Sequence, residues 1–168
     1  WFCGCTSSVC RDPKMADDYL HLLNRELELW RDKGLSKRTL KQIHFGGGTP
    51  NFLSTQQIEK IGDLIRKYFI VDGDCEFSAE LDPRTLTKEK ADAFVKIGIN
   101  RASIGVQDTN PDVQKAVNRI QPQSKNIEAA NWLRENGVNE LNIDLIYGLP
   151  LQTADSFKKT LDDAMELN

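Results

Sequence analysis

Strand-like and helix-like segments alternate along this chain, and no tandem hairpins interrupt the alternation. The predicted strands are residues 40–45, 75–81, 101–107 and 140–146. The predicted helices, which carry apolar residues at helical spacing, are residues 14–33, 54–68, 87–98, 112–118, 124–135 and a last one that begins at Thr153. This order favours βα units around a parallel sheet. Two architectures remain, namely an open doubly wound sheet and a closed or partial βα barrel.

The predicted strands have a period of two, whereas parallel strands buried on both faces are nearly continuous apolar runs. In the strand at 75–81 the odd positions are apolar, and the even positions are Glu76, Ser78 and Glu80. The two strands that follow alternate in the same way. We expect the apolar face to pack on the helices and the polar face to line a barrel that encloses a polar ligand. Polar groups that satisfy one another in an ordinary barrel core would give the same pattern.

Ligand-type residues gather near the carboxyl ends of these strands, where βα barrels carry their chemistry. They are Glu80, Gln107, Asp144 and the glycine run that follows the first strand, within the stretch HFGGGTP at residues 44–50. Glycines leave the backbone bare, so a ligand can approach it closely. The glycine run could form a tight turn or a phosphate-binding loop. It matches neither the dinucleotide-binding fingerprint nor the P-loop spacing. His44 could face the barrel interior, but we expect a satisfied core histidine.

The composition is that of a globular protein of 168 residues with a formal net charge of -3 and a pI near 5.5. Charges of both signs are mixed, so neither a nucleic acid nor a membrane is expected as a partner. The sequence shows no signal peptide and no apolar run of the ~18 residues that a membrane helix needs. Because the chain has no initiator Met and stops within a helical pattern, we expect a fragment that is truncated at both ends.

Cysteines crowd the first ten residues, at Cys3, Cys5 and Cys10. Such crowding suggests metal or redox chemistry more than a disulfide framework. The first five residues, WFCGC, resemble the end of the cysteine loop of radical S-adenosylmethionine enzymes, whose pattern is Cys-x3-Cys-x2-Cys. By that spacing Cys3 would be the third ligand of a 4Fe–4S cluster, and the other two would precede Trp1. One thiolate cannot hold the cluster, so the fragment by itself is expected to be inactive.

Within that superfamily the chain is similar to the oxygen-independent coproporphyrinogen III oxidases. Six motifs in order carry the resemblance, at residues 2–5 (FCGC), 44–50 (HFGGGTP), 80–84 (ELDPR), 105–108 (GVQD), 117–121 (VNRIQ) and 142–150 (NIDLIYGLP). Related haem chaperones share the GGGTP stretch, but they usually lack the Cys-Gly-Cys end and carry Ser where Asp108 stands here. A haem chaperone without oxidase activity is the alternative. A plain βα-barrel module that binds an anionic metabolite is a third hypothesis.

The resemblance implies an α/β fold, a partial (βα)6 radical-SAM TIM-like barrel. Residues 1–168 would be a single domain that lacks the first strand and the last βα unit. It also implies a 4Fe–4S cluster ligated by Cys3 and two molecules of S-adenosylmethionine per site. The residues implied to bind S-adenosylmethionine are Phe2, Gly47, Gly48, Thr49, Glu80, Gln107, Arg119 and Asp144. Arg119 would be the carboxylate partner, because its guanidinium fork suits bidentate binding.

The implied reaction is a radical decarboxylation that turns two propionate side chains of coproporphyrinogen III into vinyl groups and gives protoporphyrinogen IX. The cofactor would carry the hard step, and the protein would supply orientation and a closed site. The implied setting is a monomeric cytoplasmic enzyme of haem biosynthesis with an electron-donor protein as partner.

Overall fold

The computed structural model describes residues 12, 14–35 and 37–167, and it confirms the predicted alternation. The elements in chain order are α1 (Lys14–Asp32), β1 (Thr39–Phe45), the 3₁₀ helix η1 (Pro50–Phe52), α2 (Thr55–Tyr68), β2 (Ile70–Leu81), α3 (Lys88–Ile97), β3 (Arg101–Gln107), α4 (Pro111–Ala116), α5 (Gln123–Glu135), β4 (Glu140–Leu145) and α6 (Ala154–Met165). None of the helices in these described ranges is long and apolar enough to cross a bilayer.

Strand β2 begins at Ile70, earlier than the predicted start at residue 75. The reason is a register shift in its pairing with β1, where Leu40 pairs with Val71 but Gln42 pairs with Glu76. The extra residues of β2 lie in this irregularity, and pairing resumes after it. An alternation pattern finds only the regular part of such a strand, so the sequence predicted the end of β2 and missed its beginning.

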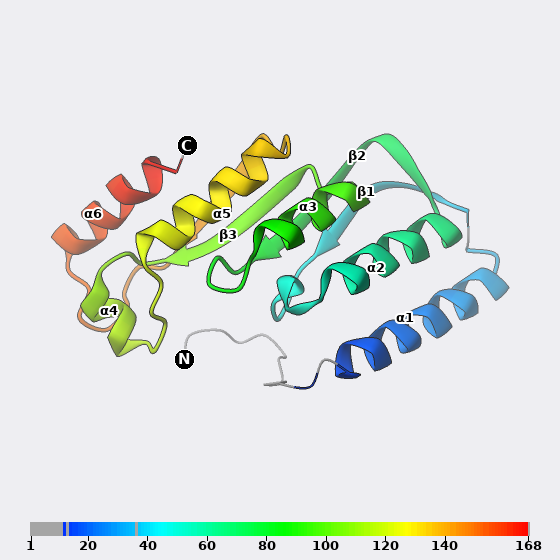
Figure 1. Ribbon diagram of the computed structural model, residues 1–168, viewed down its shortest axis with the longest axis horizontal. Helices are drawn as coiled ribbons and strands as arrows, with labels where there is room; N and C mark the ends of the chain where they lie inside the picture. The colour runs from blue at the N-terminus through cyan, green and yellow to red at the C-terminus, as the bar shows by residue number, and fades with distance from the viewer. Residues whose placement is uncertain (1–11, 13, 36, 168) are drawn as a thin grey trace.

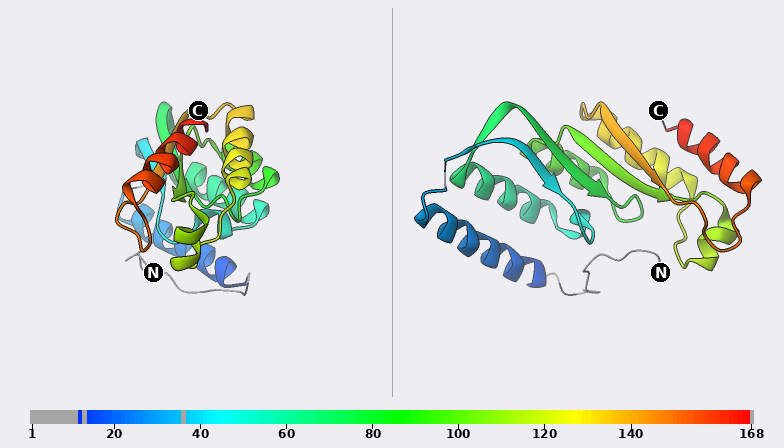
Figure 2. Two further views of the ribbon diagram at one scale, coloured as in Figure 1. Left: turned by 90° about the vertical axis from the view of Figure 1, so that its left-hand side faces the viewer. Right: turned by 180° about the vertical axis from the view of Figure 1, so that it is seen from behind.

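The described strands form one parallel sheet in the order β1-β2-β3-β4. Helices α2, α3 and α5 lie side by side over one face of it (Figure 1). Seen from behind, the strands face the viewer with these helices beyond them (Figure 2). A doubly wound sheet would carry helices on both faces. Because the helices cover only one face of the described sheet, the structure favours the partial barrel over the doubly wound sheet.

The apolar face of the strands and the inner sides of the helices make the core. Phe77 of β2 and Phe94 of α3 are among its largest fully buried side chains. Phe77 also meets Phe45 of β1 edge to face, with ring centroids 5.2 Å apart. Helix α2 begins with a capping box, because Ser54 and Gln57 each accept a hydrogen bond from the other's backbone N–H.

The polar face is the concave side and has a hollow of about 260 Å³. In the amino-terminal half of this face the charged side chains pair with one another, since Arg101 forms ion pairs with Glu76 at 3.2 Å and Glu140 at 3.1 Å. The expectation for His44 was wrong, because its ring is half exposed on this face and its Nδ1 lies 2.8 Å from the Ser78 hydroxyl. In the amino-terminal half of the face, the polar groups therefore satisfy one another as in an ordinary barrel core.

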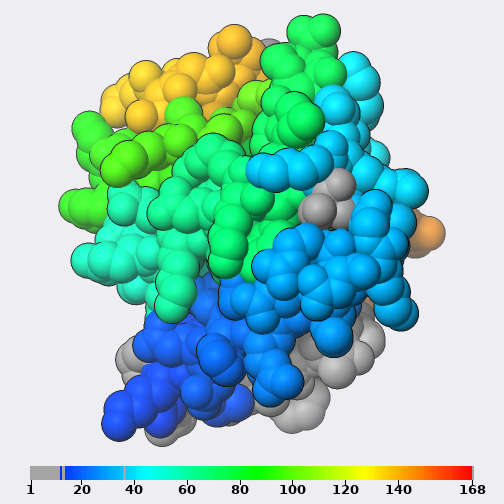
Figure 3. Space-filling view, turned by 90° about the vertical axis from the view of Figure 1, so that its right-hand side faces the viewer, coloured from blue at the N-terminus to red at the C-terminus, as the bar shows by residue number. Residues whose placement is uncertain are grey.

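Helix α1 packs along α2 at the β1 end of the sheet. Figure 3 shows this end of the molecule, with α1 in blue below and the residues of β1 and α2 above it. A largely apolar hollow of about 400 Å³ lies between α1 and the start of β1, lined by Leu23, Leu27, Trp30 and Leu40 among others. The two hollows thus differ in character, and the polar one lies on the same face of the sheet as Glu80, Gln107 and Asp144 but is lined by other residues of that face, among them His44, Ser78 and Ser103.

Candidate functional site

The glycine run and the carboxylate of Glu80 form one part of the site, at the carboxyl ends of β1 and β2. Gly47 and Gly48 have φ angles of 69° and 52°, which L side chains rarely adopt, and open space lies where a Cβ would be. The N–H of Gly47 donates to Glu80 Oε2 at 3.2 Å, and the other oxygen of Glu80 lies 3.4 Å from His44 Nε2. Half of the Glu80 side chain stays exposed, so its oxygens can accept further hydrogen bonds.

A second part surrounds Gly105 near the end of β3. A Cβ on Gly105 would come within 2.8 Å of Gln107 Nε2 and 3.3 Å of Arg119 Nη2, so both side chains lie over this glycine on the polar face. Gly105 pairs in register with Asp144 of β4, whose Oδ2 accepts a 2.7 Å hydrogen bond from Ser103. The structure therefore brings Gln107, Arg119 and Asp144 together.

Gln107 adopts a φ angle of 70°, which is uncommon for a residue with a side chain. The register between β3 and β4 shifts at this point, between Gly105 and Gln107. A bulge of this kind turns a side chain away from the direction that the regular pleat would give it. Here it places the Gln107 amide against Gly105 instead of further along the strand.

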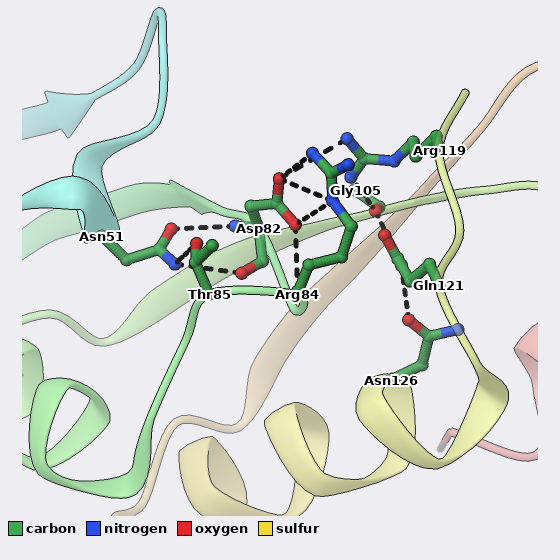
Figure 4. Close-up of polar contacts among 8 residues, drawn as sticks. All are labelled: Asn51, Asp82, Arg84, Thr85, Gly105, Arg119, Gln121 and Asn126. Carbon is green, nitrogen blue, oxygen red and sulfur yellow. Dashed lines mark hydrogen bonds and ion pairs between the residues drawn. The ribbon is translucent and has the colours of Figure 1, made fainter. Parts of the chain in front are cut away.

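Arg119 enters the site from the loop after α4, and only 15% of its side chain is exposed. Its Nη2 donates to the Gly105 carbonyl at 2.8 Å, and its Nη1 lies 3.5 Å from Asp82 Oδ2 (Figure 4). Its Nε is buried and has no hydrogen-bond partner among the described residues. Burial lowers the pKa of Arg119 although the charge of Asp82 opposes this, and an arginine still remains a cation. A buried guanidinium with unused donors is suited to an anion.

Asp82 follows β2 directly and faces two arginines. Arg84 holds both of its oxygens, with Nε 3.0 Å from Oδ1 and Nη2 2.6 Å from Oδ2. Burial alone would raise the pKa of Asp82, but the hydrogen bonds from Arg84 and the charge of Arg119 outweigh it. The pKa therefore lies below its ordinary value.

Asn51 of η1 fixes the position of this loop from the other side. Its Oδ1 accepts from the Asp82 N–H at 2.9 Å, and its Nδ2 donates to the Asp82 carbonyl and to Thr85 Oγ1, both at 2.9 Å (Figure 4). The Asn51 side chain is fully buried. Because η1 directly follows the glycine run, this amide joins the glycine loop to the loop that carries Asp82.

The lowered pKa of Asp82 predicts an acid-dependent contribution to stability. An unfolded aspartate titrates at about pH 3.9, and the folded value lies below it. The stabilisation is therefore complete above about pH 4 and is lost as the pH falls through the folded pKa. Urea unfolding of wild type and Asp82→Asn should show a stability difference at pH 7 that shrinks below pH 4. A difference that is constant or grows with acid would contradict this.

The other site predictions divide into those that the structure places and those that it does not describe. Thr49 is half-buried at the start of η1, and its hydroxyl makes no capping bond, which leaves it available. Phe2 and Cys3 lie outside the described residues, as do Cys5 and Cys10. Within the described ranges no group of three or more His, Cys, Asp or Glu side chains is placed to hold a metal ion. Cys75 faces the core, and burial raises the pKa of its thiol, as expected of a structural cysteine.

Sequence reasoning did not assign a role to Asn51, Asp82 or Arg84. The latter two belong to the ELDPR motif, but the motif says nothing about which arginine reaches which carboxylate. A charged Asp-Pro-Arg segment directly after a strand that has Glu80 as its penultimate residue was a usable signal. No comparable signal marks Asn51, because an asparagine after proline usually indicates only a turn.

The geometry suits a zwitterionic ligand that also carries hydroxyl groups. Arg119 offers a buried fork for a carboxylate, and Glu80 and Asp144 offer acceptors for ammonium or hydroxyl groups. The Gly47–Gly48 backbone is open to close approach. The methionine and ribose parts of S-adenosylmethionine have these groups, so the residues present fit that molecule.

Comparisons with known proteins agree with this geometry. The oxygen-independent coproporphyrinogen III oxidase of Escherichia coli (strain K12) is 43% identical over 168 residues, which are 100% of this chain and 36% of that protein. The enzyme of the same name from Synechocystis sp. is 36% identical, with the same coverage of both chains. This chain thus spans about a third of the length of these curated relatives.

Among solved structures, coproporphyrinogen III oxidase (HemN) from Escherichia coli, described as a radical SAM enzyme, superposes with a TM-score of 0.93. The match has 43% identity and covers 99% of this chain and 38% of that one. The family model of the Radical SAM superfamily matches residues 1–164. The chain therefore belongs to the Radical SAM superfamily.

Proposed function

We propose that this chain is part of the catalytic barrel of an oxygen-independent coproporphyrinogen III oxidase. The proposed reaction removes the carboxyl groups of two propionates of coproporphyrinogen III and gives two vinyl groups in haem biosynthesis. The observation that carries the proposal is the buried, partly unpaired fork of Arg119 beside Gln107 and Asp144. It occurs in a chain that is similar along its whole length to enzymes of that name.

Membership of the superfamily implies a 4Fe–4S cluster and S-adenosylmethionine. When bound, these two supply a 5′-deoxyadenosyl radical that takes a hydrogen atom from the substrate. In the proposal Cys3 is one of the cluster ligands. Glu80 accepts hydrogen bonds from the S-adenosylmethionine that lies beside the cluster. Gly47, Gly48 and Thr49 form a ledge for its methionine end.

The remaining residues orient the ligand and keep it in one place. Asp144 is held by the Ser103 hydroxyl, so its free lone pairs point from a fixed position toward ribose hydroxyls. Glu80 is held in the same way by the Gly47 N–H. Fixed acceptors of this kind reduce the number of orientations that the bound cofactor can adopt, which favours reaction at one carbon.

The proposal also includes features that concern the whole enzyme. A second S-adenosylmethionine would lie beside the first, against Phe2, Gly48, Thr49, Gln107, Arg119 and Asp144, and Arg119 would hold its carboxylate. Electrons would come from a donor protein, and the enzyme would be a cytoplasmic monomer. Each vinyl group formed requires loss of CO2, one hydrogen atom and one electron from the propionate, so the electron must pass to an acceptor. The haem-chaperone alternative is not favoured, because the relatives reported above are named as oxidases.

The test uses the intact protein, reconstituted with iron and sulfide without oxygen, reduced, and supplied with S-adenosylmethionine, coproporphyrinogen III and an electron acceptor. We expect 5′-deoxyadenosine, CO2 and a divinyl product. Formation of 5′-deoxyadenosine without decarboxylation would contradict the oxidase and favour another substrate. Absence of 5′-deoxyadenosine in a protein that carries a full cluster would contradict the radical chemistry.

Gly105→Ala tests the assembly around β3. The added Cβ would be 2.8 Å from Gln107 Nε2 and 3.3 Å from Arg119 Nη2, so both mobile side-chain ends must move. We expect a change in unfolding free energy below about 1 kcal/mol but a loss of about tenfold in S-adenosylmethionine affinity, the equivalent of one hydrogen bond. Gly73→Ala is the control, because a Cβ there meets nothing within 4 Å. Equal affinities of the two variants would contradict the placement.

A further inference from the structure

Asp82 could pair with either of two arginines, and the structure shows it taken by Arg84. Arg84 makes a two-pronged contact, at 3.0 Å from Nε to Oδ1 and 2.6 Å from Nη2 to Oδ2. The backbone N–H of Arg84 also donates to Oδ1 at 3.0 Å. Only Pro83 separates the two residues, and the fixed φ of proline limits the conformations of this short segment. The pair is therefore a local unit that forms without help from Arg119.

Arg119 lies at the margin of this unit. Its Nη1 is 3.5 Å from Asp82 Oδ2, longer than the 2.7–2.9 Å of a good charge-assisted bond. Its Nη2 binds the Gly105 carbonyl, and its Nε lacks a hydrogen-bond partner among the residues that the structure describes. The guanidinium is thus held in place by a weak ion pair and one strong bond, while part of its fork stays unused.

We propose that Arg84 is a positioning residue, which occupies Asp82 so that Arg119 stays open for the carboxylate of a ligand. The inference rests on the proposed function, because that function gives Arg119 a carboxylate to bind. Arg84 need not touch the ligand for this role. It acts through Asp82. The Asp82 side chain is only 11% exposed, so water cannot replace a lost charged partner of this carboxylate.

Charge and geometry both give the direction of the effect. Asp82, Arg84 and Arg119 together carry one net positive charge, and loss of Arg84 leaves none. A buried carboxylate without its partner is costly, so Asp82 would turn to the nearest remaining cation, Arg119. Arg119 Nη1 already lies 3.5 Å from Asp82 Oδ2, so the two groups are close enough to form a tighter ion pair. The fork would then be taken, and a ligand carboxylate would lose its partner.

The test measures equilibrium binding to the intact, cluster-reconstituted protein without oxygen. In wild type, S-adenosylmethionine should bind more tightly than decarboxylated S-adenosylmethionine, which lacks the carboxylate. Arg84→Gln should weaken S-adenosylmethionine binding by about tenfold to a hundredfold and leave the decarboxylated analogue unchanged. Arg84→Lys keeps the charge but not the fork, so its affinity for S-adenosylmethionine should lie between those of wild type and Arg84→Gln.

A second substitution separates positioning from a merely structural role. Adding Asp82→Asn to Arg84→Gln removes the carboxylate that would capture Arg119, so affinity should return to within about threefold of wild type. A loss caused by local unfolding would not be rescued by a further substitution. Arg66→Gln is the matched control, since Arg66 makes a similar local pair with Asp63 at 3.2 Å on α2, away from the site. Its S-adenosylmethionine affinity should equal that of wild type.

The outcomes separate the inference from the proposed function. If wild type prefers S-adenosylmethionine over the analogue but Arg84→Gln binds it equally well, or if the double variant is no better than Arg84→Gln, the inference is wrong and the function stands. A parallel titration with coproporphyrin III and its tetramethyl ester shows whether a propionate is the partner instead. If wild type shows no carboxylate preference for either ligand, the proposed role of Arg119 fails, and the inference fails with it.

Discussion

Replacement of Arg119 by methionine should lower the affinity of the intact protein for S-adenosylmethionine by about a hundredfold. A two-pronged contact between a guanidinium and a carboxylate contributes roughly 3 kcal/mol when it is shielded from water. Methionine keeps much of the buried volume of the side chain, and Asp82 keeps its two-pronged bond to Arg84. The fold should therefore survive, and isothermal titration calorimetry without oxygen measures the loss.

Arg119→Lys is the informative companion to this variant. Lysine retains the charge but offers a single point of contact, so an intermediate affinity is expected. If the methionine and lysine variants both bind as tightly as wild type, Arg119 is not the carboxylate partner. A loss of affinity accompanied by a large drop in melting temperature would instead assign Arg119 a structural role.

Asn51→Ala should reduce the free energy of unfolding by about 3 kcal/mol, because it removes three hydrogen bonds and leaves buried backbone groups of Asp82 without partners. The same change releases the loop that carries Asp82 from the glycine loop. We therefore expect weaker binding of S-adenosylmethionine at temperatures where the variant is still folded. Urea unfolding gives the first quantity and calorimetric titration the second.

Asn100→Ala is the control for this coupling. Asn100 makes a similar contact in the middle of β2, since its Oδ1 accepts from the Phe77 N–H at 2.9 Å and its Nδ2 donates to the Cys75 carbonyl at 2.8 Å. Its loss should lower stability and leave S-adenosylmethionine binding unchanged. If both variants weaken binding in proportion to their loss of stability, the effect of Asn51 on the site is not specific.

The sequence predicted the layers of this fold because local rules and the global fold agree. Strand β3 shows this most clearly, where Ala102, Ile104 and Val106 are buried and the intervening Arg101, Ser103 and Gln107 are half-buried on the polar face. A period of two with helices between the strands leaves few alternatives to a one-sided parallel sheet. The same reasoning correctly placed Glu80, Gln107 and Asp144 on one face at one edge.

The sequence could not predict the contacts that depend on distant loops. Nothing in the local pattern indicates that Asn51 reaches Asp82, because that contact joins residues 31 positions apart. The turned backbone of Gln107 likewise results from a register shift between β3 and β4, which no single strand encodes. His44 was expected to be a satisfied core histidine, although its alternation with Ile43 and Phe45 places it on the polar face.

The central claim is that the polar face at the carboxyl ends of the strands binds S-adenosylmethionine. Hydrogen–deuterium exchange of the intact, cluster-reconstituted protein, with and without S-adenosylmethionine, tests it most directly. The account predicts slower exchange in residues 46–53 and 105–109 and unchanged exchange in α6. Unchanged exchange in both of these loop segments at a saturating concentration of the ligand would contradict it.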